Sequence, residues 1–263
     1  MPQESVSFER AASYYDQTRG FPPGEDRAAA AVIAAAGGLT PQSRVLEIGV
    51  GTGRIALPLA RYVALYVGVD ISPAMMARLR AKQNGEPIAL VQANAVHLPF
   101  APASFDAVVA VHVFHLIPDW PAALAQCARV LKAGGLLLHC WNDRSRSAMG
   151  TLRDAWRQVV PEHLEQQPGV GFAYNNTFAL DHGWREAGAA QVHAYVQQRS
   201  PQDFLNSHRQ RVTSSMWNLD DDLVARGVAA IEAAIAAHYP DPQAPIADQA
   251  LFTVKPFAPP TGR

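Results

Sequence analysis

Apolar runs and helix-forming stretches alternate through the first half of the chain. The runs typical of buried strands are Val45–Ile48, Tyr66–Asp70, Ile88–Gln92, Phe105–Val111 and Leu136–Trp141. The helix-forming stretches are Ala28–Ala36, Ile55–Tyr62, Ala74–Lys82 and Pro121–Leu131. The strand runs are nearly continuous in apolar residues, which is typical of strands covered on both faces. This β-α-β alternation predicts an α/β fold with a doubly wound parallel sheet.

The alternation stops after Arg144, where the pattern becomes mainly helical. Helices are expected over Ala148–Val160, Thr177–Ala187 and Pro201–Tyr239, the last of them broken near Leu219. A polar connection, Glu162–Gly171, and two further strands, Gln191–Gln197 and Ala250–Phe257, complete this half. We therefore expect a core over residues 1–143 and, over residues 144–263, a helical cap together with the last strands of the sheet.

Three glycines at alternate positions follow the first predicted strand. Glu47-Ile48 leads into Gly49-Val50-Gly51-Thr52-Gly53-Arg54, and a helix-forming stretch comes next. Because glycine has no β-carbon, a ligand can lie against the backbone of such a strand-to-helix turn. The dinucleotide fingerprint needs its third glycine three residues after the second, where this chain has Arg54. Glu47 can fix the loop amides or order water near a ligand. The positive charge of Arg54 in the first helical turn opposes the helix dipole, which favours pairing with Glu47 or with a ligand carboxylate. The alternative is that the Arg54 side chain is simply solvated.

Polar residues also follow the next two predicted strands. Asp70 can accept hydrogen bonds from both hydroxyls of a ribose, while Ser72 is better placed to cap the following helix. Asn94 can bond an adenine ring, although asparagine there is also typical of a turn. Because the carboxyl ends of parallel strands meet at one edge of the sheet, we expect these side chains to lie near the glycine loop.

These motifs resemble those of the class I S-adenosylmethionine-dependent methyltransferases, in particular the small-molecule branch that includes ubiquinone- and menaquinone-biosynthesis-like enzymes. The resemblance covers residues 40–142 and is carried by Glu47-x-Gly49-x-Gly51-x-Gly53, Val69-Asp70-Ile71-Ser72, Leu98-Pro99-Phe100 with Ser104-Phe105-Asp106, and the run from Arg129 to Gly135. The chain departs from the family at Asn94, where aspartate is usual, and at Val50, where a smaller residue is common. The resemblance implies a seven-strand-type Rossmann-like sheet with helical cap additions.

The resemblance also implies S-adenosyl-L-methionine as the methyl donor and a small molecule as the acceptor. By the resemblance, the residues that contact the donor are Tyr15, Arg19, Glu47, Gly49, Gly51, Gly53, Asp70, Ile71, Met75, Asn94, Ala95 and Val111. Arg19 would pair with the methionyl carboxylate and Tyr15 would shield the sulfonium, both from an N-terminal helix that covers the donor. The alternative is that this segment is an ordinary amphipathic helix that precedes the fold. The protein then mainly supplies orientation and a dry site for an in-line displacement.

His112 and His115 follow the fourth predicted strand, at the edge that faces the transferred methyl in this family. A histidine of near-neutral pKa can take a proton from an acceptor hydroxyl. We expect His112 to be the catalytic base because it is closer to the strand end; alternatively, one histidine shapes the pocket and the other packs in the core. His139 and Trp141 share a face of the fifth strand and either line the pocket or belong to the core. Further candidates for a lid are Trp156, Tyr174, Trp184, His208, Arg209, Arg211 and Trp217.

Composition narrows the choice of partners. The 263 residues are 49% hydrophobic and 17% charged, and the net charge of −1 provides no broad basic field for nucleic acid. The N-terminus shows no signal-peptide pattern, and the longest apolar stretch, Ala28 to Leu39, is too short to span a membrane. Cys127 and Cys140 lie in apolar surroundings without metal-ligand spacing, which is typical of a reducing cytoplasm. We expect a cytoplasmic protein without a nucleic-acid, membrane or metal partner.

Two other functions stay open. A non-catalytic S-adenosylmethionine-binding sensor or scaffold would keep the cofactor site and lack a working acceptor pocket. A nicotinamide-dependent oxidoreductase would bind a dinucleotide and no S-adenosylmethionine.

Overall fold

The computed structural model describes residues 4–143, 147–171 and 177–260. The chain divides into two compact units. The first unit is Met1–Asn142, Pro168–His193 and Phe252–Arg263, and the second is Asp143–Gln167 and Ala194–Leu251. The division into two domains at residues 143 and 144 that we expected stays a prediction.

One mixed sheet organises the chain. Its strands are β1 (Arg44–Ile48), β2 (Leu65–Asp70), β3 (Ile88–Gln92), β4 (Phe105–Val111), β5 (Leu131–Asp143), β6 (Arg185–Glu186), β7 (Gln191–Arg199) and β8 (Ile246–Ala258). The strand order is β3-β2-β1-β4-β5-β8-β6, and β7 pairs with β8 outside this path. Strands β1 to β5 pair in parallel, whereas β6 is antiparallel to β8. The predicted doubly wound, seven-strand-type α/β fold is confirmed.

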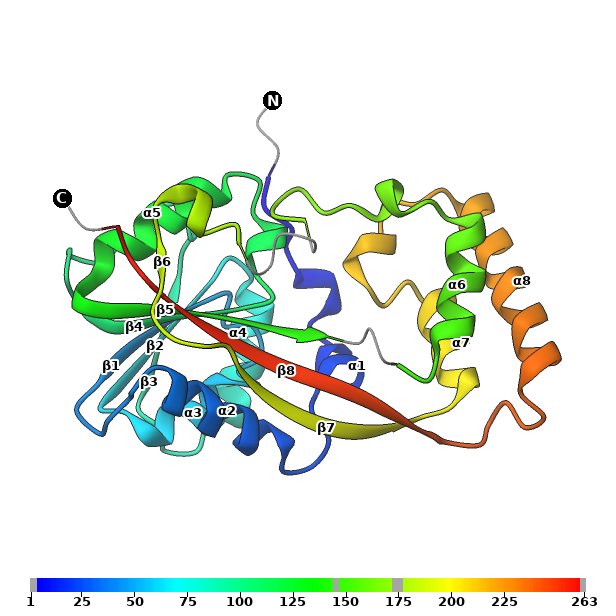
Figure 1. Ribbon diagram of the computed structural model, residues 1–263, viewed down its shortest axis with the longest axis horizontal. Coiled ribbons are helices and arrows are strands. Elements are labelled where there is room, and N and C mark those ends of the chain that lie inside the picture. Colours follow the sequence, from blue (N-terminus) through cyan, green and yellow to red (C-terminus); the bar gives the residue numbers. More distant parts are fainter. Residues whose placement is uncertain (1–3, 144–146, 172–176, 261–263) are drawn as a thin grey trace. The chain divides into compact units, whose positions relative to one another are not determined.

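Helices cover the parallel strands on both sides. The helices of the first unit are α1 (Tyr15–Arg19), α2 (Glu25–Ala36), α3 (Ala56–Leu59), α4 (Pro73–Lys82) and α5 (Trp120–Val130). Those of the second unit are α6 (Gly150–Val159), α7 (Pro201–Arg209) and α8 (Asp221–His238). Figure 1 shows α2 and α3 next to each other beside the strands, with α5 on the opposite side of them. Among the described residues, no helix combines the length and apolar character that a membrane crossing requires.

Local signals in the sequence explain where several helices begin. The Ser72 hydroxyl accepts a hydrogen bond from Met75 N (3.2 Å) with Pro73 at the first helical position, so α4 begins where its cap and proline predict. Helix α7 begins with a reciprocal capping box between Ser200 and Asp203. These caps satisfy backbone amides that have no partner inside the helix.

The first unit has a core of apolar side chains from the parallel strands and α5. Leu46, Val108 and Leu137 come from neighbouring strands, and Leu124 and Cys127 come from α5; all five are fully buried or nearly so. Such burial on both faces of the strands agrees with their continuous apolar sequence.

The second unit has its own core between α6, α7 and α8. A Cβ atom on Gly227 of α8 would lie 2.5 Å from Trp156 Cζ3 of α6, so this glycine permits the close approach of the two helices. Trp156 is 2% exposed and packs with Phe204 and Ile231 in the same cluster.

The predicted helix Thr177–Ala187 is wrong. The chain there forms a single 3-10 turn, Leu180–His182, followed by the short strand β6. Gly183 has a left-handed backbone (φ 79°), and its amide donates to Leu180 O, so the turn ends at this glycine. Strand β5 also begins earlier than expected, at Leu131, because the glycine pair at 134–135 forms an irregularity in its pairing with β4 and does not end the element.

Candidate functional site

The three glycines after β1 all have a left-handed backbone, with φ of 70° at Gly49, 55° at Gly51 and 81° at Gly53. A Cβ atom on Gly49 would lie 2.6 Å from Val113 Cγ2, and one on Gly53 would lie 2.5 Å from Leu79 Cγ. Packing within the protein therefore explains these two glycines. A Cβ on Gly51 would meet only the flexible end of a methionine side chain at 3.3 Å and a backbone oxygen at 3.9 Å. Gly51 is thus the member of the motif with an open approach to its backbone.

Asp70 joins the loop after β1 to the loop after β2. Its Oδ2 accepts a hydrogen bond from Gly51 N (2.9 Å), and its Oδ1 accepts one from Ser72 N (2.8 Å). The half-buried position raises the pKa of Asp70, although the amide bonds oppose this rise. Each carboxylate oxygen has two acceptor sites, so both oxygens can accept a further hydrogen bond.

Glu47 does not bind the loop amides in this structure. The amides of Gly49 and Val50 donate to Val69 O, and Glu47 instead accepts a hydrogen bond from the Tyr66 hydroxyl (2.9 Å). Glu47 is 2% exposed, and this burial raises its pKa to about 8. The carboxyl group is therefore mainly neutral at physiological pH.

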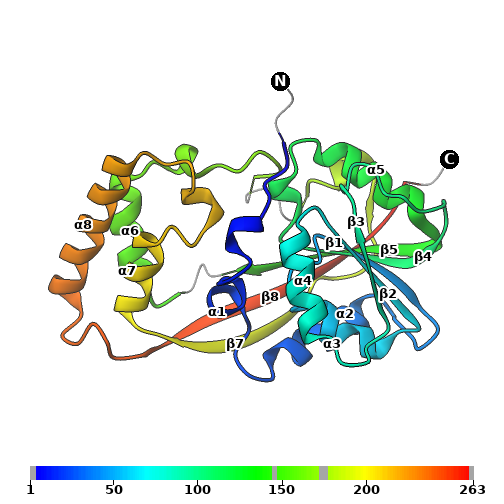
Figure 2. The same ribbon diagram turned by 180° about the vertical axis from the view of Figure 1, so that it is seen from behind.

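The N-terminal residues 4–21, which we call the strap, are attached to the loops of the site. Asp16 accepts hydrogen bonds from the Thr52 hydroxyl and from Lys82 Nζ (2.7 Å). Glu9 accepts hydrogen bonds from the Ser72 hydroxyl and from Ala74 N at the start of α4. Figure 2 shows α1 and the strap residues before it beside α4. The strap therefore lies against the glycine loop and the loop after β2.

Arg54 also binds the strap. Its Nη1 donates to Arg19 O (2.8 Å), and its guanidinium lies 5.2 Å from the centre of the Phe21 ring. Solvation, the simpler expectation for Arg54, is therefore wrong. The Tyr15 ring packs edge-on against Phe8, with 5.7 Å between the ring centres. Both Tyr15 and Arg19 are half-buried.

His112 stands at the end of β4 with φ of 50°, a left-handed conformation that is costly for a residue other than glycine. Asn142 N, at the end of β5, donates a hydrogen bond to His112 Nε2 (2.9 Å). The neutral ring then carries its hydrogen on Nδ1. Asn142 Oδ1 is a buried oxygen that has no hydrogen-bond partner in the described chain.

His115 lies in the 3-10 turn Phe114–Leu116 that follows β4. Its ring is 6.4 Å from the ring of His112, at an interplanar angle of 87°. Burial and, to a lesser degree, the nearby charge of Arg19 lower the pKa of His115 to about 4. His115 is therefore neutral at physiological pH, next to a strap residue that we expect to bind the methyl donor.

The remaining expected contacts surround the same loops. Met75 and Ala95 are buried and Ile71 is half-buried. Val111, the last residue of β4, is buried, whereas Asn94 is exposed. Asn94 Oδ1 accepts from Val96 N (3.2 Å), which is the turn role that we considered for it. Its contact with adenine stays a prediction.

His139 belongs to the core, which was the alternative to its lining the acceptor pocket. It is 3% exposed and lies among the rings of Trp141, Phe114 and Phe178 at 5.0 to 5.9 Å.

The lid candidates have structural contacts within the unit to which each belongs. Trp156 and Trp184 are core residues, and His208 stacks on Phe204. Arg209 and Arg211 pair with Glu232 and Asp221, and Trp217 Nε1 donates to Arg211 O. Tyr174 lies outside the described residues.

Sequence reasoning missed the strap contacts of Glu9, Asp16 and Thr52. Thr52 occupies the unspecified position between two glycines of the motif, and Glu9 precedes every motif, so no local pattern marks them. Within the described ranges, no group of three or more histidine, cysteine, aspartate or glutamate side chains is arranged to hold a metal ion.

Part of the first unit matches a known protein family. Residues 46–139 match the model of a methyltransferase domain. Phosphatidylethanolamine N-methyltransferase of Cereibacter sphaeroides is 36% identical over 135 residues, which are 50% of this chain and 64% of that protein. The fatty-acid O-methyltransferase of Mycolicibacterium smegmatis is 40% identical over 98 residues, or 36% of each protein.

The curated relatives match only in part. Three uncharacterised mycobacterial proteins are 36% identical over 108 residues, and the match spans 39% of their length. Demethylmenaquinone methyltransferase of Thermus thermophilus is 37% identical over 99 residues, which cover 36% of this chain and 45% of that enzyme.

Solved structures agree in fold over nearly the whole chain. A Bacillus halodurans protein superimposes with a TM-score of 0.61 and 19% identity, covering 90% of this chain and all of that one. The cyclase SpnF superimposes with a TM-score of 0.56 and 18% identity, covering 99% of this chain. These likenesses show the fold alone, because a fold can host unrelated reactions. The family match, in contrast, includes the glycine loop, Asp70 and β4, and residues 46–139 are similar to the methyltransferase-domain family.

Proposed function

We propose that this protein binds S-adenosyl-L-methionine at the glycine loop and transfers the methyl group to a small-molecule acceptor. The observation that carries the proposal is the pair of loops joined by Asp70, within the part of the chain that matches the family. Gly51 offers open backbone, and the carboxylate beside it has acceptor sites left for a ribose.

The residues around these loops fit the methyl donor. Met75 lies next to Gly51, and Glu47 comes two residues before the first glycine of the loop. The strap is bonded to the loop through Asp16 and the carbonyl oxygen of Arg19, so Tyr15 and Arg19 belong to a segment that contacts the loop. S-adenosylmethionine supplies a methyl group that is already activated. The protein residues therefore mainly have to orient the two substrates and exclude water.

His112 is our candidate for the group that handles the proton of the acceptor. Its Nε2 lone pair is engaged by Asn142 N, so it can accept a proton only if this hydrogen bond is released. The buried Asn142 Oδ1 beside it supports recognition of an acceptor that carries an O–H or N–H group. Full turnover of a His112→Ala variant on the true acceptor would contradict this role.

We propose that the acceptor is a small molecule and neither a nucleic acid nor a membrane surface. The near-neutral charge of the chain supports this choice. The names of the relatives include an N-methyltransferase and an O-methyltransferase, so family membership is compatible with more than one acceptor atom. Cys127 and Cys140 are both free and buried, in agreement with the reducing cytoplasm that we propose.

Calorimetric titration with S-adenosylhomocysteine and with NAD tests the proposal. We expect binding of the former only, and at least about tenfold weaker binding by Asp70→Ala, which corresponds to about 1.4 kcal/mol. Binding of NAD alone would favour the oxidoreductase. Near wild-type affinity of the Asp70 variant would refute the ribose contact. Binding without methyl transfer to any of a broad set of labelled acceptors would favour the non-catalytic sensor.

A further inference from the structure

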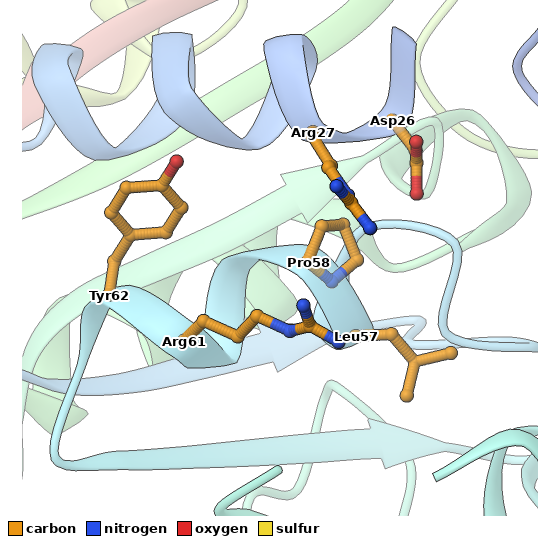
Figure 3. A pocket seen from close by; sticks show the side chains of 6 residues that line it. All are labelled: Asp26, Arg27, Leu57, Pro58, Arg61 and Tyr62. Carbon is orange, nitrogen blue, oxygen red and sulfur yellow. The ribbon is translucent and has the colours of Figure 1, made fainter. Parts of the chain in front are cut away.

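A pocket lies between α2 and the segment formed by α3 and the 3-10 helix Ala60–Tyr62. It is lined by Asp26, Arg27, Leu57, Pro58, Arg61 and Tyr62, as Figure 3 shows. None of the residues that we expect to contact the methyl donor or the acceptor lines it. Any ligand of this pocket is therefore separate from the proposed methyl transfer.

Two guanidinium groups from different elements face this pocket. Arg61 Nη2 donates to Glu86 Oε1 (3.0 Å), and Glu86 also accepts from Asn84 N (2.6 Å). These bonds to Asn84 and Arg61 lower the pKa of Glu86, so the carboxylate stays ionised and orients the Arg61 guanidinium. One arginine of the pair is thus held in place before a ligand binds.

The second arginine, Arg27, has no carboxylate at ion-pair distance in the part of the chain that the structure describes. Asp26 precedes it in the first turn of α2, where a negative charge is favourable to the helix, and forms no described ion pair with Arg27 or Arg61. The lining therefore holds two guanidinium groups and one carboxylate, that of Asp26, while Glu86 pairs with Arg61. An anion placed between the two arginines would accept hydrogen bonds from both guanidinium groups.

The rest of the pocket suits an organic group. Leu57 and Pro58 form an apolar wall, and Tyr62 adds an aromatic ring that is 40% exposed. Arginine binds phosphate through two parallel N–H···O bonds, and its planar group also accepts stacking. An anionic phosphate with an apolar or aromatic substituent matches both halves of this lining.

We propose that this pocket binds a small organic phosphomonoester, with the phosphate between Arg27 and Arg61 and the organic group against Leu57, Pro58 and Tyr62. The site needs no contact with the methyl donor. It is therefore occupied equally in the presence and absence of S-adenosylhomocysteine.

Titration of the full chain with phenyl phosphate and with inorganic phosphate tests the proposal. We expect the wild type to bind phenyl phosphate more tightly than inorganic phosphate. Arg27→Gln and Arg61→Gln should each weaken phenyl phosphate binding at least about tenfold. Arg27→Lys keeps the charge and loses the planar fork, so it should weaken binding by a smaller factor. Arg78→Gln on α4 is the matched control, because Arg78 is exposed and its substitution removes the same charge away from the pocket.

Several results would overturn the proposal. Wild-type dissociation constants weaker than about 10 mM for both probes would exclude the site. Equal weakening by Arg78→Gln would show a general charge effect, and equal affinity for both probes would exclude the organic subsite. Thermal unfolding and S-adenosylhomocysteine titration of each variant identify a misfolded protein. Since Arg27→Lys retains the charge and most of the contact surface, it supplies the decisive comparison if a glutamine variant fails to fold.

Discussion

Glu47→Gln should change how the stability of the protein depends on pH. The carboxyl is buried beneath the glycine loop, its hydrogen bond comes from Tyr66, and the charges near it belong to Arg54 and Asp70. Cys140 faces the same carboxyl, and its thiol pKa is raised by burial, so it stays neutral below pH 8. Glutamine has nearly the same shape and can accept the same bond, but it does not titrate. The comparison therefore isolates one ionisation.

The direction of this pH dependence follows from the pKa values of Glu47 in the unfolded and folded states. In the unfolded chain Glu47 titrates at about 4.3, whereas burial raises its pKa to about 8 in the folded protein. The folded state thus retains the proton longer, and the stability from this group is fully present below pH of about 4.3 and decreases as pH rises toward 8. Between pH 5 and 7 the loss is about 2–3 kcal/mol, or about 4–12 °C in Tm for a chain of this size.

Scanning calorimetry of wild type and Glu47→Gln, without ligand, at pH 5, 6 and 7 measures this loss. We expect the Tm of the wild type, relative to that of the variant, to fall steadily with pH. Other titrating groups are common to both proteins and cancel in the difference. Parallel Tm profiles, or a relative Tm that rises with pH, would show that Glu47 is ionised in the folded state and would refute the reasoning.

Three further substitutions test other features of the first unit. Gly53→Ala should lower the stability measured in thermal unfolding by about 2–4 kcal/mol, because alanine is strained in the left-handed conformation and its Cβ would clash with Leu79. Gly38→Ala is the control, because Gly38 has φ of 56° and no atom within 4 Å of the added carbon, so this variant should show the strain alone. Equal losses of stability in the two variants would contradict the packing argument. Asp16→Asn should speed tryptic cleavage of the strap and release of S-adenosylhomocysteine, and unchanged rates would mean that the strap is held otherwise. The wild type should lose stability as pH falls from about 6.5 to 4, because the unfolded chain protonates His115 at a higher pH than the folded protein does. His115→Gln should not show this loss, and the same loss in both proteins would assign it to another group.

The parallel strands could be predicted closely because each is a continuous apolar run between polar or glycine-rich turns. β3 and β4 have the predicted bounds, and β1 and β2 differ by one residue. The segment Thr177–Ala187 failed because its composition favours a helix, while Gly183 in a left-handed conformation and pairing of Arg185 with Ala258 favour a turn and a strand. Tertiary pairing overrides local propensity in such short segments.

The site was predictable only where its residues are close in sequence. The glycine loop and Asp70 belong to adjacent elements, so a local motif marks them. Asp16 meets Thr52 across 36 residues, and Glu9 meets Ser72 across 63. The bond from Asn142 to His112 spans 30 residues and depends on the pairing of β4 with β5. No pattern within a few residues encodes such contacts, because they arise from the order of strands in the sheet.

The hydrogen bonds of Asp70 have a consequence for the thermodynamics of ligand binding. A single carboxylate holds the amides of Gly51 and Ser72, which belong to different loops, so the two loops become ordered when the protein folds. Their conformational entropy is then lost in folding and not in binding. A ligand that enters this site therefore meets two loops that are already ordered, and its binding free energy is not reduced by the cost of ordering them.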